Sequence, residues 1–397
     1  MKTWGRLLLM GEWEDYKISD IADVIGGGTP KTSIEEYWNG NIPWLSVVDF
    51  NSGKKYVSTT EKSITSLGLE KSSTKLLLQN DIIISARGTV GALAMLDKPM
   101  TFNQSCYGMR ANENTTSDYL FYLLKNTVKH LQQASYGAVF DTITKNTFDE
   151  TTISLPPLKE QKAIAEVLSS LDDKIDLLHR QNKTLEELAQ TLFRQWFVEE
   201  GDEGWEEIPL SNFGDIICGK TPSKKKAEYY DGNIPFIKIP DMHGNTFIFH
   251  TTDTLTEEGS NSQKNKLLPP KSICVSCIAT VGLVSMNIIE SQTNQQINSI
   301  IPKEEKYRYF LYLFIKSSYD LLHAMASGGT ATLNLNTGNF QKMNILKPDD
   351  KIINNFHTLV EPQFNKIFAN QQQIKTLENI RDTLLPKLMN GEVRVKF

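Results

Sequence analysis

Two long stretches of the chain carry apolar residues at every third or fourth position, the spacing of one face of an α-helix. The first covers more than about four heptads, with Asn182 as its one polar seam position. Pro362 in the second stretch aligns with Ser170 in the first, and proline and serine both suit a helix start. Each stretch therefore predicts a helix that begins there, runs about 28 residues and reaches roughly 40 Å. The seam positions are Ile164, Leu168, Leu171, Ile175, Leu178, Leu185, Ala189, Leu192 and Trp196, and then Phe364, Ile367, Ile374, Leu377, Leu384 and Leu388.

The remaining chain has the pattern of a mixed domain. Asp81–Ser85 and Ser272–Ser276 are short, apolar and rich in β-branched residues, which predicts buried strands. Tyr119–Leu124 and Tyr309–Phe314 predict short core helices. Glycine and proline mark Gly26–Pro30 and Asn39–Pro43 as loops.

The same landmarks occur twice, in the same order. At an offset of 192, Trp13–Ile25 aligns with Trp205–Ile217, and Tyr37–Trp44 with Tyr229–Phe236. The offset also relates Asp49 to Asp241. The chain is therefore a tandem duplication of a globular part followed by a helical part. The predicted boundaries are residues 11–157 and 205–348 for two globular domains, and 158–200 and 349–391 for two helical spacers.

These elements predict an α+β protein with two duplicated domains joined by two long helices. One alternative is that each apolar stripe packs on its own domain, but two matched stripes favour a helix pair. We expect the helices to form an antiparallel coiled coil, which would relate the two copies by a pseudo-two-fold axis. A parallel pair would require the second domain to bridge back along the rod.

The net charge of −5 neither supports nor excludes a nucleic-acid partner. Residues 158–207 hold 13 acidic and 6 basic residues, so much of the acidity lies in the first helical segment. Residues 208–347 hold 14 basic and 11 acidic residues. Nucleic-acid binding requires a local basic face rather than a basic total.

The sequence contains no apolar run of 18 residues, which argues against an ordinary transmembrane helix. Lys2–Met10 lacks a cleavage site, and we interpret it as a ragged start, with Met10 as an alternative initiation codon. The expected location is the cytoplasm. Cys274 and Cys277 lie in a strand-like run that points them to opposite faces, so core cysteines are expected instead of a metal site.

Motifs of DNA-processing enzymes are missing from the sequence. It has no phosphate-binding loop ending in lysine and serine or threonine, no Asn/Asp-Pro-Pro-aromatic element of an amino-methyltransferase, and no paired histidines at helical spacing. We therefore expect no catalytic residue, no metal and no bound cofactor on this chain.

Four segments together resemble the specificity subunit of type I restriction–modification enzymes over nearly the whole chain. They are Ile153–Gln161 (ISLPPLKEQ), Leu171–Ile175 (LDDKI), Leu185–Phe197 (LEELAQTLFRQWF) and Arg381–Arg394 (RDTLLPKLMNGEVR). Asp81–Gly91 and the Gly-Gly-Thr-Pro loop are similar to that family's target-recognition domains.

The resemblance implies that each domain reads one half of a split, asymmetric site in double-stranded DNA. The helices would space the two readers and dock two modification (methyltransferase) subunits, which bind S-adenosylmethionine and methylate adenine. Separate motor-nuclease subunits that use ATP and Mg²⁺ would complete the restriction complex. The alternatives are a coiled-coil scaffold that does not bind DNA and a self-contained restriction or modification enzyme.

Basic and hydroxyl residues next to the repeated loops are the candidate DNA contacts. Arg87 follows a buried strand in a glycine-rich loop, where its guanidinium could hold phosphate or guanine. A surface salt bridge is the alternative for Arg87, and a solvated lysine run is the alternative for residues 224–226. The full set is Thr29, Lys31, Arg87, Thr89 and Lys145 in the first copy, and Lys220, Thr221, Lys224, Lys225 and Lys226 in the second.

Two further sets complete the predicted sites. Asn103-Gln104 and Asn294-Gln295 recur in both copies, and such amides can read adenine, but recurrence favours a structural role because base readers should differ between half-sites. The residues expected to form the coiled coil and dock partners are Leu171, Ile175, Leu178, Leu185, Leu192, Trp196, Ile367, Ile374, Leu377, Leu384 and Leu388.

Overall fold

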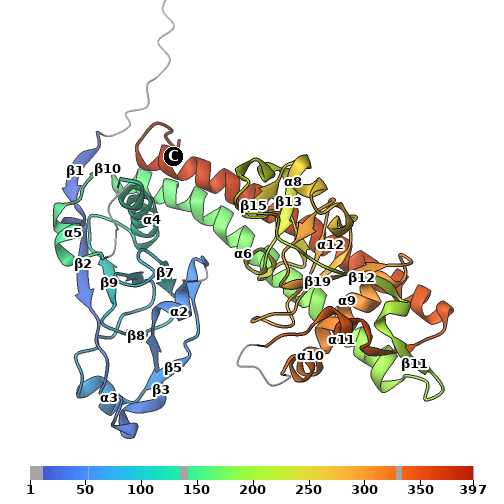
Figure 1. Cartoon of the computed structure of the whole chain (residues 1–397). Coiled ribbons are helices and arrows are strands. Elements are labelled where there is room, and N and C mark those ends of the chain that lie inside the picture. Colours follow the sequence, from blue (N-terminus) through green and yellow to red (C-terminus); the bar gives the residue numbers. More distant parts are fainter. Residues whose placement is uncertain (1–11, 52, 135–141, 328–332, 397) are drawn as a thin grey trace, which may run out of the picture. The chain divides into compact units, whose positions relative to one another are not determined.

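A computed structural model describes residues 12–51, 53–134, 142–327 and 333–396 (Figure 1). The segment Lys2–Met10, with the alternative start at Met10, lies outside this range. The chain divides into two compact units. Unit 1 comprises Met1–Asp176 and Thr376–Phe397, and unit 2 comprises Leu177–Lys375. Each unit therefore contains one globular domain and a part of both long helices.

Ten short strands form the sheets of unit 1. The strands are β1 (Glu14–Lys17), β2 (Ala22–Gly26), β3 (Trp38–Leu45), β4 (Tyr56–Val57), β5 (Lys62–Ile64), β6 (Ile82–Ser85), β7 (Leu93–Leu96), β8 (Thr101–Phe102), β9 (Cys106–Ala111) and β10 (Thr152–Leu155). Its helices are α1 (Ile18–Ile21), η1 (Glu35–Tyr37), α2 (Val47–Phe50), α3 (Ser66–Glu70), α4 (Ser117–Ala134) and α5 (Lys145–Glu150).

Unit 2 contains a matching set of strands. They are β11 (Glu206–Pro209), β12 (Gly214–Cys218), β13 (Tyr230–Ile237), β14 (Phe247–Ile248), β15 (Asp253–Leu255), β16 (Ile273–Ser276), β17 (Val284–Asn287), β18 (Gln292–Thr293), β19 (Ile297–Pro302) and β20 (Asn344–Lys347). Its helices are η3 (Leu210–Asn212), η4 (Ala227–Tyr229), α7 (Ile239–Met242), α8 (Glu257–Asn261), η5 (Lys264–Lys266), α9 (Tyr307–Ser317), α10 (Tyr319–Ala326) and α11 (Thr337–Gln341).

The sheet topology confirms the duplication. The five-stranded sheets have the orders β2-β9-β6-β7-β4 and β12-β19-β16-β17-β14, and the three-stranded sheets have the orders β5-β3-β8 and β15-β13-β18. Each unit also has a two-stranded ribbon, β1-β10 or β11-β20. Every strand of unit 1 thus has a counterpart in unit 2 with the same neighbours, and the α+β fold class is confirmed.

The strands and core helices lie where the sequence predicts them. All four residues of β6 and of β16 are buried, as their continuous apolar runs indicate. Cys274 and Cys277 belong to different apolar clusters, which confirms that the two thiols lie on opposite faces. Burial raises the pKa of Cys274 to about 12 and that of Cys277 to about 11.

The prediction of a loop at Asn39–Pro43 is wrong, because these residues belong to strand β3. The pairing of β3 with β5 shifts register between Trp38 and Ile42, and Asn39 adopts a φ of 60°. A Cβ on Gly40 would lie 2.4 Å from the carbonyl oxygen of Ile64. The turn-forming residues therefore serve a β-bulge inside the strand instead of ending it.

The predicted starts of the long helices are also wrong, since both begin about three turns earlier. The first, α6 (Leu158–Arg194), continues into a π-helical turn, η2 (Gln195–Glu199), and the second is α12 (Asp350–Met389). Pro362 lies inside α12, although proline removes one helical hydrogen bond there. Packing compensates, because the flanking residues Val360 and Phe364 are fully buried.

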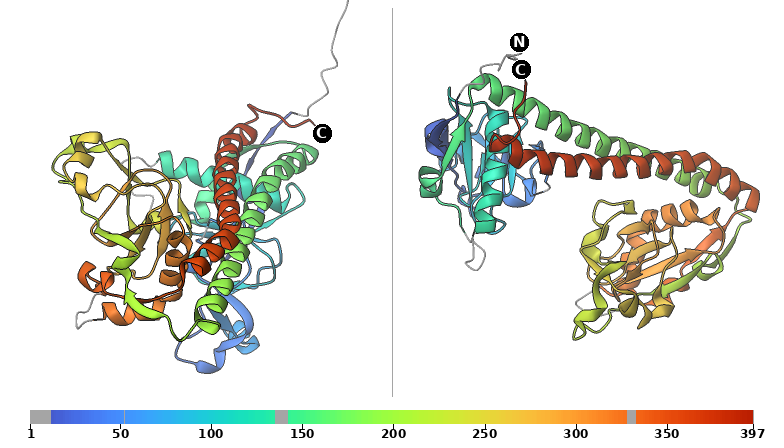
Figure 2. Two further views of the ribbon diagram at one scale, coloured as in Figure 1. Left: turned by 90° about the vertical axis from the view of Figure 1, so that its right-hand side faces the viewer. Right: turned by 90° about the horizontal axis from the view of Figure 1, so that it is seen from above.

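The two long helices run antiparallel within each unit. In unit 1, Arg381 Nη1 of α12 donates to Asp172 Oδ1 of α6 at 2.7 Å, and Arg394, beyond the end of α12, pairs with Glu160. In unit 2, Asn370 Nδ2 donates to Asn182 Oδ1 at 2.9 Å. Figure 2 shows the helices side by side.

Each long helix also packs on the globular domains, which the seam pattern alone did not show. Ile164 and Leu168 of α6 join the core of unit 1, whereas Phe193 and Phe197 join the core of unit 2. Among the predicted seam and docking residues, the buried ones are Ile164, Leu168, Ile175, Leu178, Ala189, Phe364, Ile367, Ile374 and Leu388, and the half-buried ones are Leu171, Leu185, Leu192, Trp196, Leu377 and Leu384. No helix in the described ranges is long and apolar enough to cross a bilayer.

Candidate nucleic-acid interface

The loop that follows the first strand of each five-stranded sheet is held tightly against the domain. Gly27 and Gly219 occupy equivalent positions, and a Cβ there would lie 2.1 Å from the carbonyl oxygen of Asn103 and 2.2 Å from that of Asn294. Only glycine permits so close an approach of two backbones. The next residues, Gly28 and Lys220, donate backbone hydrogen bonds to Phe102 and Thr293.

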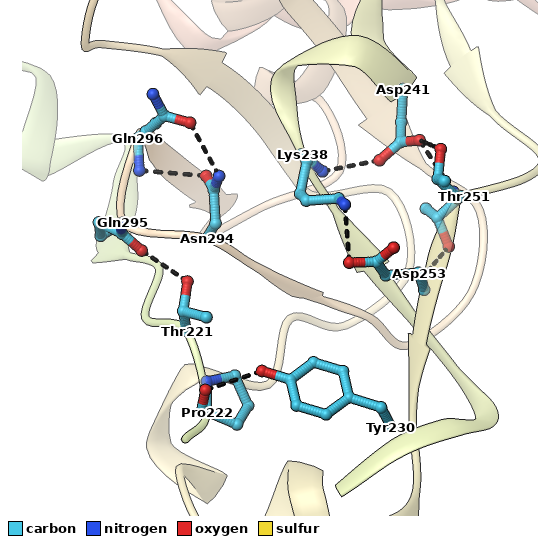
Figure 3. A network of polar contacts seen from close by, with 11 residues as sticks. Thr221, Pro222, Tyr230, Lys238, Asp241, Thr251, Asp253, Asn294, Gln295 and Gln296 are labelled. Atoms are coloured by element: carbon cyan, nitrogen blue, oxygen red, sulfur yellow. Dashed lines mark hydrogen bonds and ion pairs between the residues drawn. The ribbon is translucent and has the colours of Figure 1, made fainter. Parts of the chain in front are cut away.

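A threonine of this loop bonds the repeated glutamine in both copies. Thr29 Oγ1 donates to Gln104 Oε1, and Thr221 Oγ1 donates to Gln295 Oε1 at 2.6 Å (Figure 3). Both glutamines are exposed. The bond fixes which way each amide faces and ties the loop to the turn between two sheet strands.

The asparagine before each glutamine has a structural role. Asn103 Oδ1 accepts a hydrogen bond from the backbone N–H of Ser105, and Asn294 Oδ1 accepts one from that of Gln296 (Figure 3). Such a bond two residues ahead stabilises a turn. The asparagines therefore hold the turn that presents the glutamines.

The remaining candidates of unit 1 lie on the same edge of the sheet. The backbone N–H of Ala86 donates to Ser105, and Arg87 pairs with Thr142 in a single β-bridge. Lys145 begins the short helix α5 three residues later. Arg87, Thr89 and Lys145 are all exposed, as is Lys31 in the neighbouring loop. The structure thus places the loop of Thr29 and Lys31 next to the turn at Gln104 and the loop of Arg87 and Thr89, and Lys145 follows the bridge partner of Arg87.

The candidate lysines of unit 2 lie within the equivalent loop. Lys220, Lys224, Lys225 and Lys226 are exposed, and they lie between β12 and β13. Lys226 Nζ donates to Tyr229 Oη at 2.8 Å, and this bond raises the pKa of Lys226. Thr221 directly follows Lys220 in the sequence and hydrogen-bonds Gln295.

Further polar contacts hold this loop and the helical turn α7 of the same domain. Asp241 Oδ2 accepts from the backbone N–H of Lys238 at 2.8 Å, and Lys238 Nζ donates to Asp253 Oδ2 at 2.6 Å (Figure 3). Tyr230 Oη donates to the carbonyl oxygen of Pro222 at 2.7 Å. In unit 1 Asp49 bonds Ser46 in the same way. The repeated aspartates therefore cap the helical turns α2 and α7, and Tyr230 holds the loop of unit 2 at Pro222.

Comparison with known proteins identifies this architecture. The family model described as the type I restriction modification DNA specificity domain matches residues 10–187 and again residues 202–384. The chain is 34% identical to the Type I restriction enzyme HindI specificity subunit of Haemophilus influenzae, covering 97% of this chain and 100% of that one. It is 31% identical to the MjaIX specificity subunit of Methanocaldococcus jannaschii, covering 97% and 94%.

The chain belongs to the type I restriction–modification specificity subunit family. A solved structure of the S subunit from M. genitalium matches with a TM-score of 0.56 at 16% identity, over 97% of this chain and 98% of that one, which supports the fold. Membership confirms the expected role in DNA recognition, and the two globular domains are from here on called recognition domains 1 and 2.

The two recognition domains of this specificity subunit carry their basic residues at different positions. Arg87 corresponds to Ile278, and these two residues make the same β-bridge, Arg87 with Thr142 and Ile278 with Asn334. Lys31 corresponds to Ser223 at the offset of 192. One scaffold thus presents two different chemical surfaces.

Gln104 and Gln295 differ in exposure from the asparagines that precede them. Recurrence in both copies favours a structural role, and the turn-forming bonds of Asn103 and Asn294 agree with one. The glutamines, however, are exposed and bonded to a candidate DNA-contacting threonine in each domain. An amide oxygen has two lone pairs, so the bond from threonine still leaves each glutamine able to make a bidentate contact to adenine.

Proposed function

We propose that each recognition domain reads one half of a bipartite, asymmetric site in double-stranded DNA. The observation that supports this is the pair of equivalent loop edges with different chemistry: Arg87 and Lys31 on domain 1, and Lys220 with residues 224–226 on domain 2. Identical scaffolds with different contact residues would read different half-sites.

The proposed DNA-facing surface combines phosphate contacts with base contacts. The exposed lysines would neutralise phosphates, and Arg87 would contact phosphate or the edge of guanine. Thr29 and Thr221 would position their loops through the glutamines. This assignment covers Thr29, Lys31, Arg87, Thr89, Lys145, Lys220, Thr221, Lys224, Lys225 and Lys226.

We further propose that α6 and α12 set the distance between the half-sites and dock two methyltransferase subunits. Both helices expose apolar side chains, among them Leu177, Leu188, Leu359 and Ile380. Exposed apolar residues that recur along a helix favour a protein partner. The packed seam residues would keep the helices rigid beneath that surface.

The chemistry of the complex would belong to the partners. S-adenosylmethionine would bind the methyltransferase subunits, and ATP and Mg²⁺ would bind the motor-nuclease subunits, in the cytoplasm. The specificity role supports a chain that recognises DNA without catalysing a reaction.

Co-expression with a methyltransferase subunit, followed by mapping of methylated adenines in host DNA, tests the proposal. The expected result is one bipartite motif that disappears when this chain is omitted. A scaffold without DNA contacts predicts methylation that does not depend on this chain. A self-contained enzyme predicts methylation or cleavage by the chain alone.

A matched insertion tests the spacer. One heptad would be added to α6 after Asp176 and one to α12 before Thr376, where the chain passes between its units. Both insertions are needed because the helices are antiparallel within each unit. The gap between the methylated half-sites should lengthen while both half-site sequences stay the same; an unchanged gap would refute the spacer role.

A further inference from the structure

Unit 1 contains a pocket of about 390 Å³ beside the last turns of α12. Side chains from α4, from the β6–β7 loop and from the end of α2 line it together with α12. Its charged members are Lys125, Lys129, Arg381 and Asp382, and Phe50, Phe121 and Leu385 contribute apolar walls. The volume lies within the range of small-molecule sites, roughly 300–1,000 Å³.

The duplication supplies an internal comparison for this pocket. The core helices α4 and α9 align with Tyr122 on Tyr312, so Lys125 corresponds to Ile315 and Lys129 to Tyr319. At the ends of the long helices, Thr376–Glu378 aligns with Thr184–Glu186. Arg381 therefore corresponds to Ala189, and Leu385 to Phe193.

In unit 2 three of these four equivalent residues are buried core, and Tyr319 is exposed. Ile315 and Ala189 are fully buried, and Phe193 is 3% exposed, all three in one apolar cluster. The helix also breaks at Ser318, between α9 and α10, and the ring of Tyr319 covers Gly282: a Cβ there would lie 2.9 Å from Tyr319 Cδ2. In unit 1 α4 continues without a break and carries Lys129 at the equivalent position.

Two of the three cations that line the pocket, Arg381 and Lys125, have different surroundings. Arg381 is paired with Asp172 at 2.7 Å and with Asp382 at 2.9 Å. Lys125 Nζ lies 5.8 Å from the centre of the Phe121 ring, and among the described residues no carboxylate forms an ion pair with it. Burial lowers the pKa of Lys125. A half-buried ammonium without an ion pair is costly, and the fold does not need one, because isoleucine serves at this position in unit 2.

We propose that this pocket binds a small organic anion, a carboxylate or phosphate on an apolar or aromatic body no larger than a mononucleotide. Lys125 would pair with the anionic group and Lys129 would add charge at the rim. The aromatic and aliphatic walls would contact the body of the ligand. The site is specific to unit 1, because Lys125, Leu385 and Lys129 are replaced in unit 2 by Ile315, Phe193 and Tyr319.

Calorimetric titration of the full chain with adenosine 5′-monophosphate, benzoate and inorganic phosphate tests the proposal. Saturable binding of at least one organic anion is expected. K125I, which copies the residue of unit 2, should weaken that binding at least about tenfold, whereas K98A, an exposed lysine of unit 1 outside the pocket, should change it less than about twofold. L385F, which copies Phe193, should weaken binding by filling the pocket while the charge stays.

Thermal unfolding of each variant distinguishes a loss of the binding site from a loss of stability. K125I should unfold at the same temperature as the wild-type chain or higher, because it removes a buried charge. The proposal is overturned if the wild-type chain binds no probe up to about 10 mM, or if the affinity of the bound anion is the same in K125I. Binding of inorganic phosphate alone, unaffected by L385F, would also overturn it.

Discussion

Tyr122 Oη donates a hydrogen bond of 2.8 Å to Asp172 Oδ2, and this bond attaches the core helix α4 of recognition domain 1 to the long helix α6. The other oxygen of Asp172 accepts from Arg381 of α12. Tyr312, the counterpart of Tyr122, donates to Glu186 of α6 at 2.5 Å in unit 2. A buried tyrosine thus fastens each recognition domain to the helices through a carboxylate, although different positions supply it.

Asp172→Ala should destabilise unit 1 by about 3 kcal/mol, because it leaves the guanidinium of Arg381 buried without its main partner. Scanning calorimetry of the full chain would measure the shift. Asp382→Ala is the matched control: that carboxylate also pairs with Arg381 but is half exposed, so a loss of about 0–1 kcal/mol is expected. Equal losses from the two variants would contradict the assignment.

Tyr122→Phe and Tyr312→Phe should each cost about 1–2 kcal/mol, since each leaves a carboxylate without one of its donors. The two residues belong to different compact units. Their effects in the double variant should therefore add to within about 0.5 kcal/mol. A larger deviation, measured by chemical unfolding, would show that the two units do not unfold as separate bodies.

The double variant K224A/K225A should weaken DNA binding by the assembled methyltransferase and reduce its salt dependence. If both lysines contact phosphates, the slope of log affinity against log salt should fall by about 2. The control is K347A/K351A, two exposed lysines beside the β11–β20 ribbon. An equal change of slope in both variants would show that the 220–226 loop is not part of the DNA interface.

Stability should fall as the pH drops below 6.5, partly because of His357 in unit 2. Its ring stacks on Tyr309 with 5.0 Å between centroids, and burial lowers its pKa from the ordinary 6.5. The unfolded chain therefore takes up the proton at a higher pH than the folded protein, so this contribution is present above 6.5 and is lost as the pH falls towards the folded-state pKa.

Two variants check that assignment. His357→Gln should flatten the acid side of the stability profile. Glu361→Gln should lower the pKa of His357 further, because the Glu361 charge favours the protonated ring. An NMR titration of the His357 ring protons would measure this shift, and a rise of the pKa in Glu361→Gln would contradict the account.

The repeated landmarks were enough to predict the duplicated α+β architecture, because an offset of 192 fixes equivalent positions without any knowledge of contacts. The starts of the long helices were harder to predict. Pro362 has the chemistry of a first helical turn, yet the surrounding packing keeps it inside α12. At Asn39, turn-forming residues belonged to a bulge, since a strand can absorb one positive φ where register shifts.

The candidate interface was partly predictable and the pocket was not. Thr29 and Arg87 stood out because they follow strand ends in repeated loops. The sequence pattern alone does not distinguish Lys125 from other helix lysines. Its position is unusual because its counterpart Ile315 is a buried core residue. Likewise, Leu192 and Trp196 fit the seam spacing, but Phe193 and Phe197 are buried more deeply because that helix end also faces a recognition domain.

Unit 1 is assembled from both ends of the chain. Leu385, Leu388 and Met389 complete the core that begins with Ile18 and Ile21, whereas unit 2 is one continuous stretch. During synthesis on the ribosome, the domain that emerges first therefore lacks part of its own interior until Leu385, Leu388 and Met389 have been made. A premature stop near the last codons would therefore damage the half of the protein that was made first.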